Sequence, residues 1–179
     1  MITFTFELFW IFAFIVAFWH FSKLQSAQEA LVFFIPAFAW GFFAEFTGTN
    51  FYNLYYYPKD YVFSIGNVPL AIAFGWAAII YVGYYISTKK FHIKKLVAIE
   101  IDSAIIATGI DFLILEPLAF VFKFWVWRQN DFWFGSPFFN FIGWFLIISI
   151  FIASHNYAIN KFKDKKRQAL FLLGLLSVG

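Results

Sequence analysis

Cysteine is absent from the 179-residue sequence, so disulfide bonds, thiolate catalysis and cysteine-ligated metals are excluded. Charged residues are also scarce, at 13% of the chain, whereas hydrophobic residues make up 63%. Soluble domains contain about a quarter charged residues and about half apolar ones. The composition therefore predicts an integral membrane protein.

Two long stretches, residues 61–88 and 132–160, contain no Asp, Glu, Lys or Arg. Each is long enough to cross a hydrocarbon core of about 30 Å, which takes roughly 20 helical residues. The sequence therefore predicts an all-α, polytopic membrane helix bundle that forms one membrane domain over residues 1–179. Transmembrane helices are predicted at residues 5–21, 30–46, 68–87, 97–118 and 137–156. Residues 169–179 are apolar but short, and they predict either a sixth span or an interfacial helix.

The basic residues alternate between the two ends of the predicted bundle. Loops after odd-numbered spans hold ten of them: Lys23, Lys89, Lys90, Lys94, Lys95, Lys161, Lys163, Lys165, Lys166 and Arg167. Loops after even-numbered spans hold three: Lys59, Lys123 and Arg128. The positive-inside rule then predicts a multi-pass protein of the cell membrane with its N-terminus outside. The net charge of +3 is thus a topology signal, and no nucleic-acid partner is predicted. The N-terminus lacks a basic segment, so no cleavable signal peptide is predicted.

The two loops on the less basic side share a pattern. The first contains Glu45, the aromatic pair Tyr55 and Tyr57, Pro69, and Gly75-Trp76. The second contains Glu116, the aromatic pair Trp125 and Trp127, Pro137, and Gly143-Trp144. Each unit is predicted to end a helix with its carboxylate and to open the next with proline in the first turn. Two spans separate the units, which predicts a parallel internal repeat at about residues 30–87 and 97–156, with shared sites at the repeat interface.

Ionisable groups within membrane spans are costly and by default mark function. Glu45, Asp111 and Glu116 are the candidates, whereas Glu100 and Asp102 follow a lysine cluster and are predicted at the cytoplasmic interface. On an α-helix, Asp111 and Glu116 are offset by roughly 140° and about 7.5 Å, so we expect them close together but not on one stripe. Burial among aromatic rings favours a neutral carboxylic acid, which can donate a proton at neutral pH. Trp and Tyr faces stabilise nearby cations. The combination predicts protonation of an alkene and protection of a carbocation.

Several common membrane chemistries lack their motifs. The three histidines, His20, His92 and His155, form no His-x-x-His or His-x-x-x-His box of the kind that membrane di-iron hydroxylases and desaturases use. There is no Asp-Asp-x-x-Asp for magnesium diphosphate and no Gly-x-Gly-x-x-Gly for a dinucleotide. The chemistry that remains moves a proton and water, so no metal and no cofactor are predicted.

Two groups of residues resemble the signatures of the carotenoid biosynthesis protein family. The first is Glu45-Phe46-Thr47-Gly48, Tyr55-Tyr56-Tyr57, Gly66-Asn67-Val68-Pro69-Leu70 and Trp76. The second is Asp111, Glu116-Pro117, Trp125-Val126-Trp127, Phe134-Gly135-Ser136-Pro137, Asn140 and Gly143-Trp144. Members of this family include hydratases that add water to the terminal isopropylidene double bond of carotenoids. The resemblance therefore implies a cofactor-independent carbon–oxygen lyase that acts on a carotenoid or related isoprenoid.

On this hypothesis Glu116 is the first choice for the carboxylic acid that protonates the alkene. Asp111, Glu45 or Asn140 orients the water. The substrate-binding residues would be Tyr55, Tyr57, Trp76, Trp125, Trp127, Asn140 and Trp144. Two alternatives stay open: a carotenoid cyclase that begins with the same protonation, and a small membrane transporter or lipid-binding protein that uses the repeat interface as a pathway.

Overall fold

The computed structural model describes residues 2–58, 61–129 and 132–177, most of which are helical. Within these residues, five helices are long and apolar enough to cross a membrane: Ile2–Leu24, Ala27–Phe51, Leu70–Lys90, Leu96–Phe122 and Phe138–Lys161. The predicted all-α, polytopic bundle is thereby confirmed. The spans are longer than predicted, because the helices continue past the apolar core of each segment.

The elements follow in a simple order along the chain. The helices are α1 (Ile2–Leu24), α2 (Ala27–Phe46), α3 (Leu70–Tyr85), α4 (Leu96–Ile110), α5 (Glu116–Phe122), α6 (Phe138–Lys161) and α7 (Lys165–Gly174). Short π-helical turns extend three of them: η1 (Thr47–Phe51), η2 (Ile86–Lys90) and η3 (Asp111–Leu115). The 3-10 turn η4 (Leu175–Ser177) follows α7. Four two-residue strands lie in the loops: β1 (Tyr55–Tyr56), β2 (Ser64–Ile65), β3 (Val68–Pro69) and β4 (Val126–Trp127).

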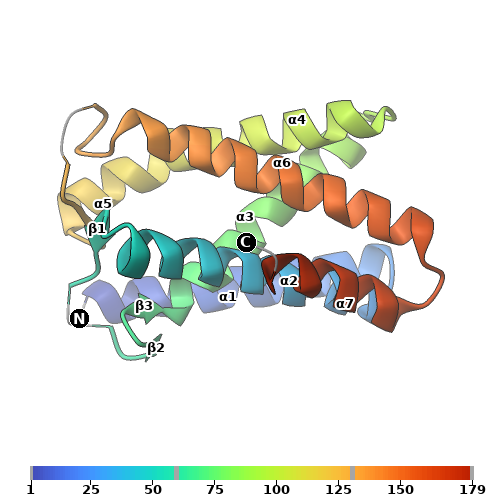
Figure 1. Cartoon of the computed structure of the whole chain (residues 1–179), viewed down its shortest axis with the longest axis horizontal. Coiled ribbons are helices and arrows are strands. Elements are labelled where there is room, and N and C mark those ends of the chain that lie inside the picture. The colour runs from blue at the N-terminus through green and yellow to red at the C-terminus, as the bar shows by residue number, and fades with distance from the viewer. Residues whose placement is uncertain (1, 59–60, 130–131, 178–179) are drawn as a thin grey trace.

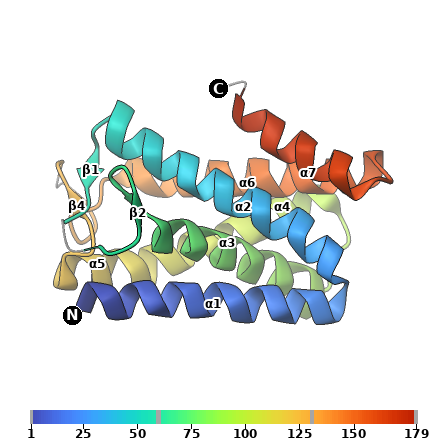
Figure 2. The ribbon, with the colours of Figure 1, turned by 90° about the horizontal axis from the view of Figure 1, so that it is seen from below.

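Helix α3 is the central element of the bundle, packed against α1, α2 and α4, while α4 also packs along α6 (Figures 1 and 2). The span that contains α3 is the most buried of the five, because 67% of its apolar stretch lies inside the protein. The N-terminus, the four strands and α5 gather at one end of the bundle. Because β1, β4 and α5 contain Tyr55, Trp127 and Glu116, several of the predicted site residues lie at that end.

The fourth span departs from the prediction at Glu116. The expected helix end at this carboxylate is wrong, because the helix continues through α5 to Phe122 and ends where Lys123 adopts a left-handed φ of 57°. Between α4 and α5 the chain forms one wide turn, η3, in which the Glu116 N–H donates to the Asp111 carbonyl five residues earlier. Such π-helical turns inside α-helices are frequent at functional sites.

Helix α7 overlaps the segment, residues 169–179, for which the sequence predicts either a sixth span or an interfacial helix. Its ten residues rise about 15 Å, only half of a hydrocarbon core. It begins where the Asp164 side chain accepts from the Arg167 N–H, and it packs along α2, where Trp40 Nε1 donates to the Leu172 carbonyl at 3.0 Å. The described residues of the C-terminal segment therefore form a short helix packed on the bundle.

Candidate functional site

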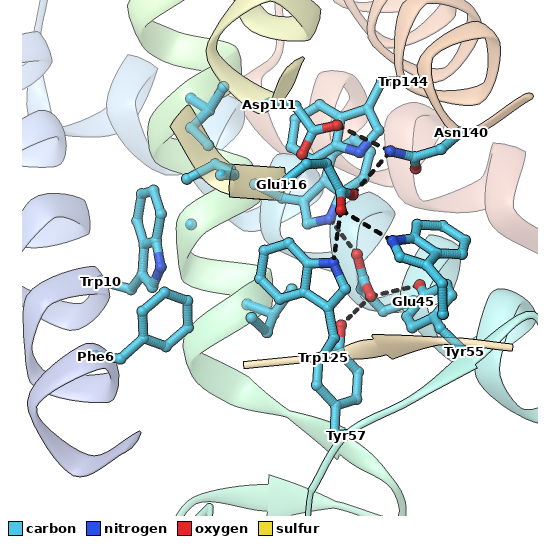
Figure 3. Close-up of a pocket in the computed structure, with 16 residues that line it drawn as sticks. Phe6, Trp10, Glu45, Tyr55, Tyr57, Asp111, Glu116, Trp125, Asn140 and Trp144 are labelled. Carbon is cyan, nitrogen blue, oxygen red and sulfur yellow. Dashed lines mark hydrogen bonds between the residues drawn. The ribbon is translucent and has the colours of Figure 1, made fainter. Parts of the chain in front are cut away.

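All ten side chains selected from the sequence line one cavity at the strand-bearing end of the bundle (Figure 3). They come from distant elements: Glu45 from α2, Trp76 from α3, Glu116 from α5, and Asn140 and Trp144 from α6. Asp111 comes from η3, and the two aromatic pairs come from the loops that hold β1 and β4. Packing thus collects three carboxyl groups, one amide and six aromatic rings in one place.

Hydrogen bonds enclose the carboxylate of Glu45, a buried residue. Its Oε2 accepts from the Tyr55 hydroxyl at 2.6 Å and from the Tyr57 hydroxyl. Its Oε1 accepts from Trp76 Nε1 at 2.6 Å. Both oxygens are therefore occupied by donors from the following loop and from the next helix.

Glu116 has a similar but distinct environment. Its Oε2 accepts from Trp127 Nε1 at 2.9 Å and from Trp125 Nε1 at 3.3 Å. Its Oε1 accepts from Asn140 Nδ2 at 3.0 Å. The aromatic pair of each loop thus holds the carboxylate that precedes it in the sequence, with tyrosine hydroxyls in one case and indole N–H groups in the other.

Asp111 lies close to Glu116, as expected from their spacing in the sequence. Asn140 Nδ2 donates at 3.0 Å to Asp111 Oδ2 as well as to Glu116, so one amide bridges both carboxyl groups. The π-helical turn η3 contributes to this closeness, because its i→i+5 hydrogen bond joins the backbones of Asp111 and Glu116 directly. Asp111 is 1% exposed.

The two loops also contact each other directly. Strands β1 and β4 pair antiparallel, with Tyr55 opposite Trp127 and Tyr56 opposite Val126. In the same cavity, the Trp76 and Trp144 rings stack with centroids 3.8 Å apart and an interplanar angle of 14°. Equivalent positions of the two predicted units therefore meet at the cavity. This arrangement supports the proposal that the units are related by a repeat axis along the membrane normal.

The loop tyrosines are held in their protonated form. Burial raises the pKa of Tyr55 and Tyr57 well above the ordinary tyrosine value, and the neighbouring Glu45 charge raises each further. Burial also raises the pKa of Tyr61, to which the Glu7 charge adds. Tyr55 and Tyr57 therefore remain hydrogen-bond donors to Glu45 across the physiological pH range.

Residues from the first helix were missed in the sequence analysis. Phe6 and Trp10 line the cavity from α1, and Glu7 lies between them with no exposed surface. Glu7 accepts from the backbone N–H groups of Val62 at 3.1 Å and Phe63 at 2.9 Å, which ties α1 to the first aromatic loop. The i, i+4 spacing of Phe6 and Trp10 places them on one helix face, but that spacing alone does not show what the face contacts.

Two further hollows adjoin the cavity. A polar one at the strand-bearing end includes Thr49, Asn67 and Arg128, and it shares Tyr55 and Tyr57 with the cavity. The other is a groove between α2 and α6 whose lining includes Ala44 and Gly143. Six residues line both the groove and the cavity: Glu45, Tyr55, Trp76, Trp127, Asn140 and Trp144. The cavity therefore has a polar neighbour on one side and an apolar groove on another.

Within the described residues, no group of three or more His, Asp or Glu side chains is arranged to hold a metal ion. The model of a protein family described as carotenoid biosynthesis protein matches residues 5–178, nearly the whole chain. No curated protein and no solved structure matches the sequence.

Proposed function

The chain belongs to the carotenoid biosynthesis protein family, and we propose that it is a membrane hydratase for the terminal isopropylidene double bond of a carotenoid or related isoprenoid. The observation that carries the proposal is the cluster of Glu45, Asp111 and Glu116 inside a cavity walled by aromatic rings. Carboxyl groups supply and accept protons, and aromatic faces stabilise cations. The enzyme would be a cofactor-independent carbon–oxygen lyase.

The reaction needs two bond-forming steps. A carboxylic acid of the cluster protonates the less substituted alkene carbon, and the π electrons form the new C–H bond. The resulting tertiary cation lies against the rings of Trp125, Trp127 and Tyr55, with ionised carboxylates nearby. A water lone pair then forms the C–O bond, and the water returns one proton to a carboxylate. The sum is an alkene plus one water giving a tertiary alcohol, without oxidation or reduction.

The polar hollow favours hydration over cyclisation as the fate of the cation. A cyclase has to keep water away from its cation, whereas this cavity adjoins a polar space across Tyr55 and Tyr57. The tyrosine hydroxyls are already committed to Glu45, so a water that passes them would arrive next to a carboxylate. We assign this hollow as the water entrance.

The groove between α2 and α6 suits the rest of the polyene. It shares six residues with the cavity and includes the small residues Ala44 and Gly143. A Cβ atom added to Gly143 would meet nothing within 4 Å, so there is room for a chain at this position. A carotenoid end group would enter the cavity from this side while its conjugated chain stays among the apolar helices.

The test is expression in a host that makes an acyclic carotenoid such as lycopene, followed by separation and mass analysis of the pigments. We expect a product heavier by one water, whose new oxygen comes from labelled water. Oxygen from labelled dioxygen would refute the hydratase. A cyclised isomer of unchanged mass would establish the cyclase alternative, and proton-coupled uptake into vesicles without any product would establish the transporter.

We also propose that the strand-bearing end faces the outside of the cell membrane, with the N-terminus, as the lysine distribution predicts. Because the chain has no cysteine, His92→Cys provides a single probe in the lysine-rich loop. An impermeant thiol reagent should label it only after the cells are opened. Labelling on intact cells would reverse the orientation.

A further inference from the structure

The three carboxyl groups of the cavity differ in how their oxygen atoms are satisfied. Glu45 and Glu116 each accept from three donors spread over both oxygens. Asp111 accepts from one donor, and its Oδ1 is buried without a hydrogen-bond partner among the described residues. We infer that Asp111, and not Glu116, carries the proton that is transferred to the alkene, while Glu116 and Glu45 remain ionised. This inference rests on the proposed function for its substrate.

The donors around Glu116 require an acceptor. Indole N–H groups can only donate, and two of them, from Trp125 and Trp127, converge on Oε2. The amide of Asn140 occupies Oε1. Donors thus take three of the about four lone-pair sites of the Glu116 carboxylate, and this environment favours its charged form.

The donors around Glu45 impose the same state. Trp76 Nε1 occupies Oε1, and the hydroxyls of Tyr55 and Tyr57 both meet Oε2. Their burial keeps both tyrosines protonated, so they supply protons to these bonds and need none from Glu45. Two of the three carboxyl groups are therefore held as anions by the donors around them.

Asp111 cannot join them as a third anion at low cost. It lies within reach of the same amide nitrogen as Glu116, and two carboxylates that share a site do not both ionise readily in a dry environment. The amide could not turn around instead, because its oxygen would then face two carboxyl oxygens and would need a proton on each. The single proton of the pair therefore resides on the group with fewer donors, at Asp111 Oδ1.

The position of that proton suits its transfer. Asp111 lines the cavity, and in Figure 3 the carboxyl group shows one hydrogen bond, to Asn140, and one oxygen free of any. The proton at Oδ1 moves to the alkene carbon, leaving Asp111 as a carboxylate. Water adds to the cation and returns a proton to Asp111, which regenerates the acid. Glu116 and Glu45 stay charged throughout and face the cation from two sides.

The experiment compares Asp111→Asn, Glu116→Gln and Glu45→Gln with the unaltered protein, each purified as the full chain in detergent. The first readout is the infrared C=O stretch of a protonated carboxyl group at neutral pH. We expect this band in the unaltered protein, in Glu116→Gln and in Glu45→Gln, and its loss in Asp111→Asn. A band that survives in Asp111→Asn, or that disappears only in Glu116→Gln, would overturn the inference.

The second readout is binding of a cation mimic, a prenyl chain that ends in a dimethylammonium group. Asp111→Asn should bind it as tightly as the unaltered protein, whereas Glu116→Gln should bind it at least about tenfold more weakly, since it lacks one of the charges that face the cation. The opposite order would contradict the assignment. A single symmetric elution peak for each variant shows that the fold is retained.

Turnover separates this inference from the proposed function. Asp111→Asn should lower hydration by about 10² to 10⁴-fold, the contribution of a general acid. If the unaltered protein forms no hydrated pigment, the proposed function fails. The infrared band still decides in that case which carboxyl group holds the proton.

Discussion

The two Gly-Trp pairs, Gly75-Trp76 in α3 and Gly143-Trp144 in α6, occupy matching places in the sequence but different surroundings in the fold. A Cβ atom on Gly75 would lie 3.0 Å from the Trp10 ring, because α1 covers this face of α3. A Cβ atom on Gly143 would meet nothing within 4 Å. The two units therefore differ in their surroundings, because the first helix covers only one of the two glycines. The uncovered unit borders the groove that we assign to the substrate.

The residues around the two glutamates differ in a comparable way. Five residues before Glu116 stands Asp111, whereas five residues before Glu45 stands Trp40, which bonds to α7. Three residues after Pro137 stands Asn140, whereas Ile72 occupies that place after Pro69. The second unit holds Asp111 and the bridging amide, and the first supplies a second carboxylate surrounded by donors. On our proposal, proton transfer therefore takes place in the second unit.

The largest difference between the units should appear when their glutamates are neutralised. Glu116→Gln is expected to lower the rate of hydrated pigment formation by at least about 100-fold, as loss of one preorganised electrostatic group does. It removes a charge next to the cation, and it also disturbs the Asn140 amide that donates to Asp111 as well. Glu45→Gln lacks the second effect and should cost about tenfold less. Rates are measured in membranes with equal protein content, and equal losses would break the comparison.

Replacing the amide tests the same asymmetry through stability. Asn140→Leu leaves Asp111 Oδ2 and one oxygen of Glu116 without this donor, and each unsatisfied buried group costs about 1–3 kcal/mol. We expect a lower unfolding temperature in detergent and a loss of hydration. Ile72→Leu, the matching change in the first unit, conserves volume and should cost less than about 1.5 kcal/mol. An unchanged unfolding temperature for Asn140→Leu would show that the bridge is not formed.

A substitution at Gly143 should have a smaller effect on hydration, and one that depends on the length of the substrate. Gly143→Phe should fill the groove between α2 and α6 and reduce hydration of a long polyene about tenfold, which corresponds to about 1.4 kcal/mol. A short isoprenoid with the same end group should be affected less, because it needs no groove. The control is Gly109→Phe in α4, where an added Cβ also meets nothing within 4 Å. Equal losses for Gly143→Phe and Gly109→Phe would remove the groove from the substrate path.

The smallest effect is expected outside both units' carboxylate clusters. Glu100 in α4 is half-buried near the lysine-rich end of the bundle, and it is not among the residues that line the cavity. Glu100→Gln should change stability by less than about 0.5 kcal/mol and leave hydration unchanged. A clear loss of product formation would show that carboxylates at the lysine-rich end also contribute to the reaction.

Much of the fold and the composition of the site could be predicted from the sequence. Uncharged stretches reveal spans, because a bilayer core demands about 20 apolar helical residues wherever a helix crosses it. The repeated spacing of a glutamate, an aromatic pair, a proline and a Gly-Trp pair selected side chains that all line one cavity. Phe6 and Trp10 were not predicted, because nothing in the sequence of an apolar first helix shows which of its faces lines the cavity.

The sequence by itself determined that helices cross the membrane and which residue types reach its less basic end, since hydrophobic length and charge act locally along the chain. Only the tertiary structure decided how those residues meet. The π-helical turn η3 joins the backbones of Asp111 and Glu116, and the Asn140 amide from α6 bridges their side chains. The covering of Gly75 by α1 and the opening beside Gly143 depend on helices that are distant in sequence. Relative positions of this kind arise from packing, which no local spacing specifies.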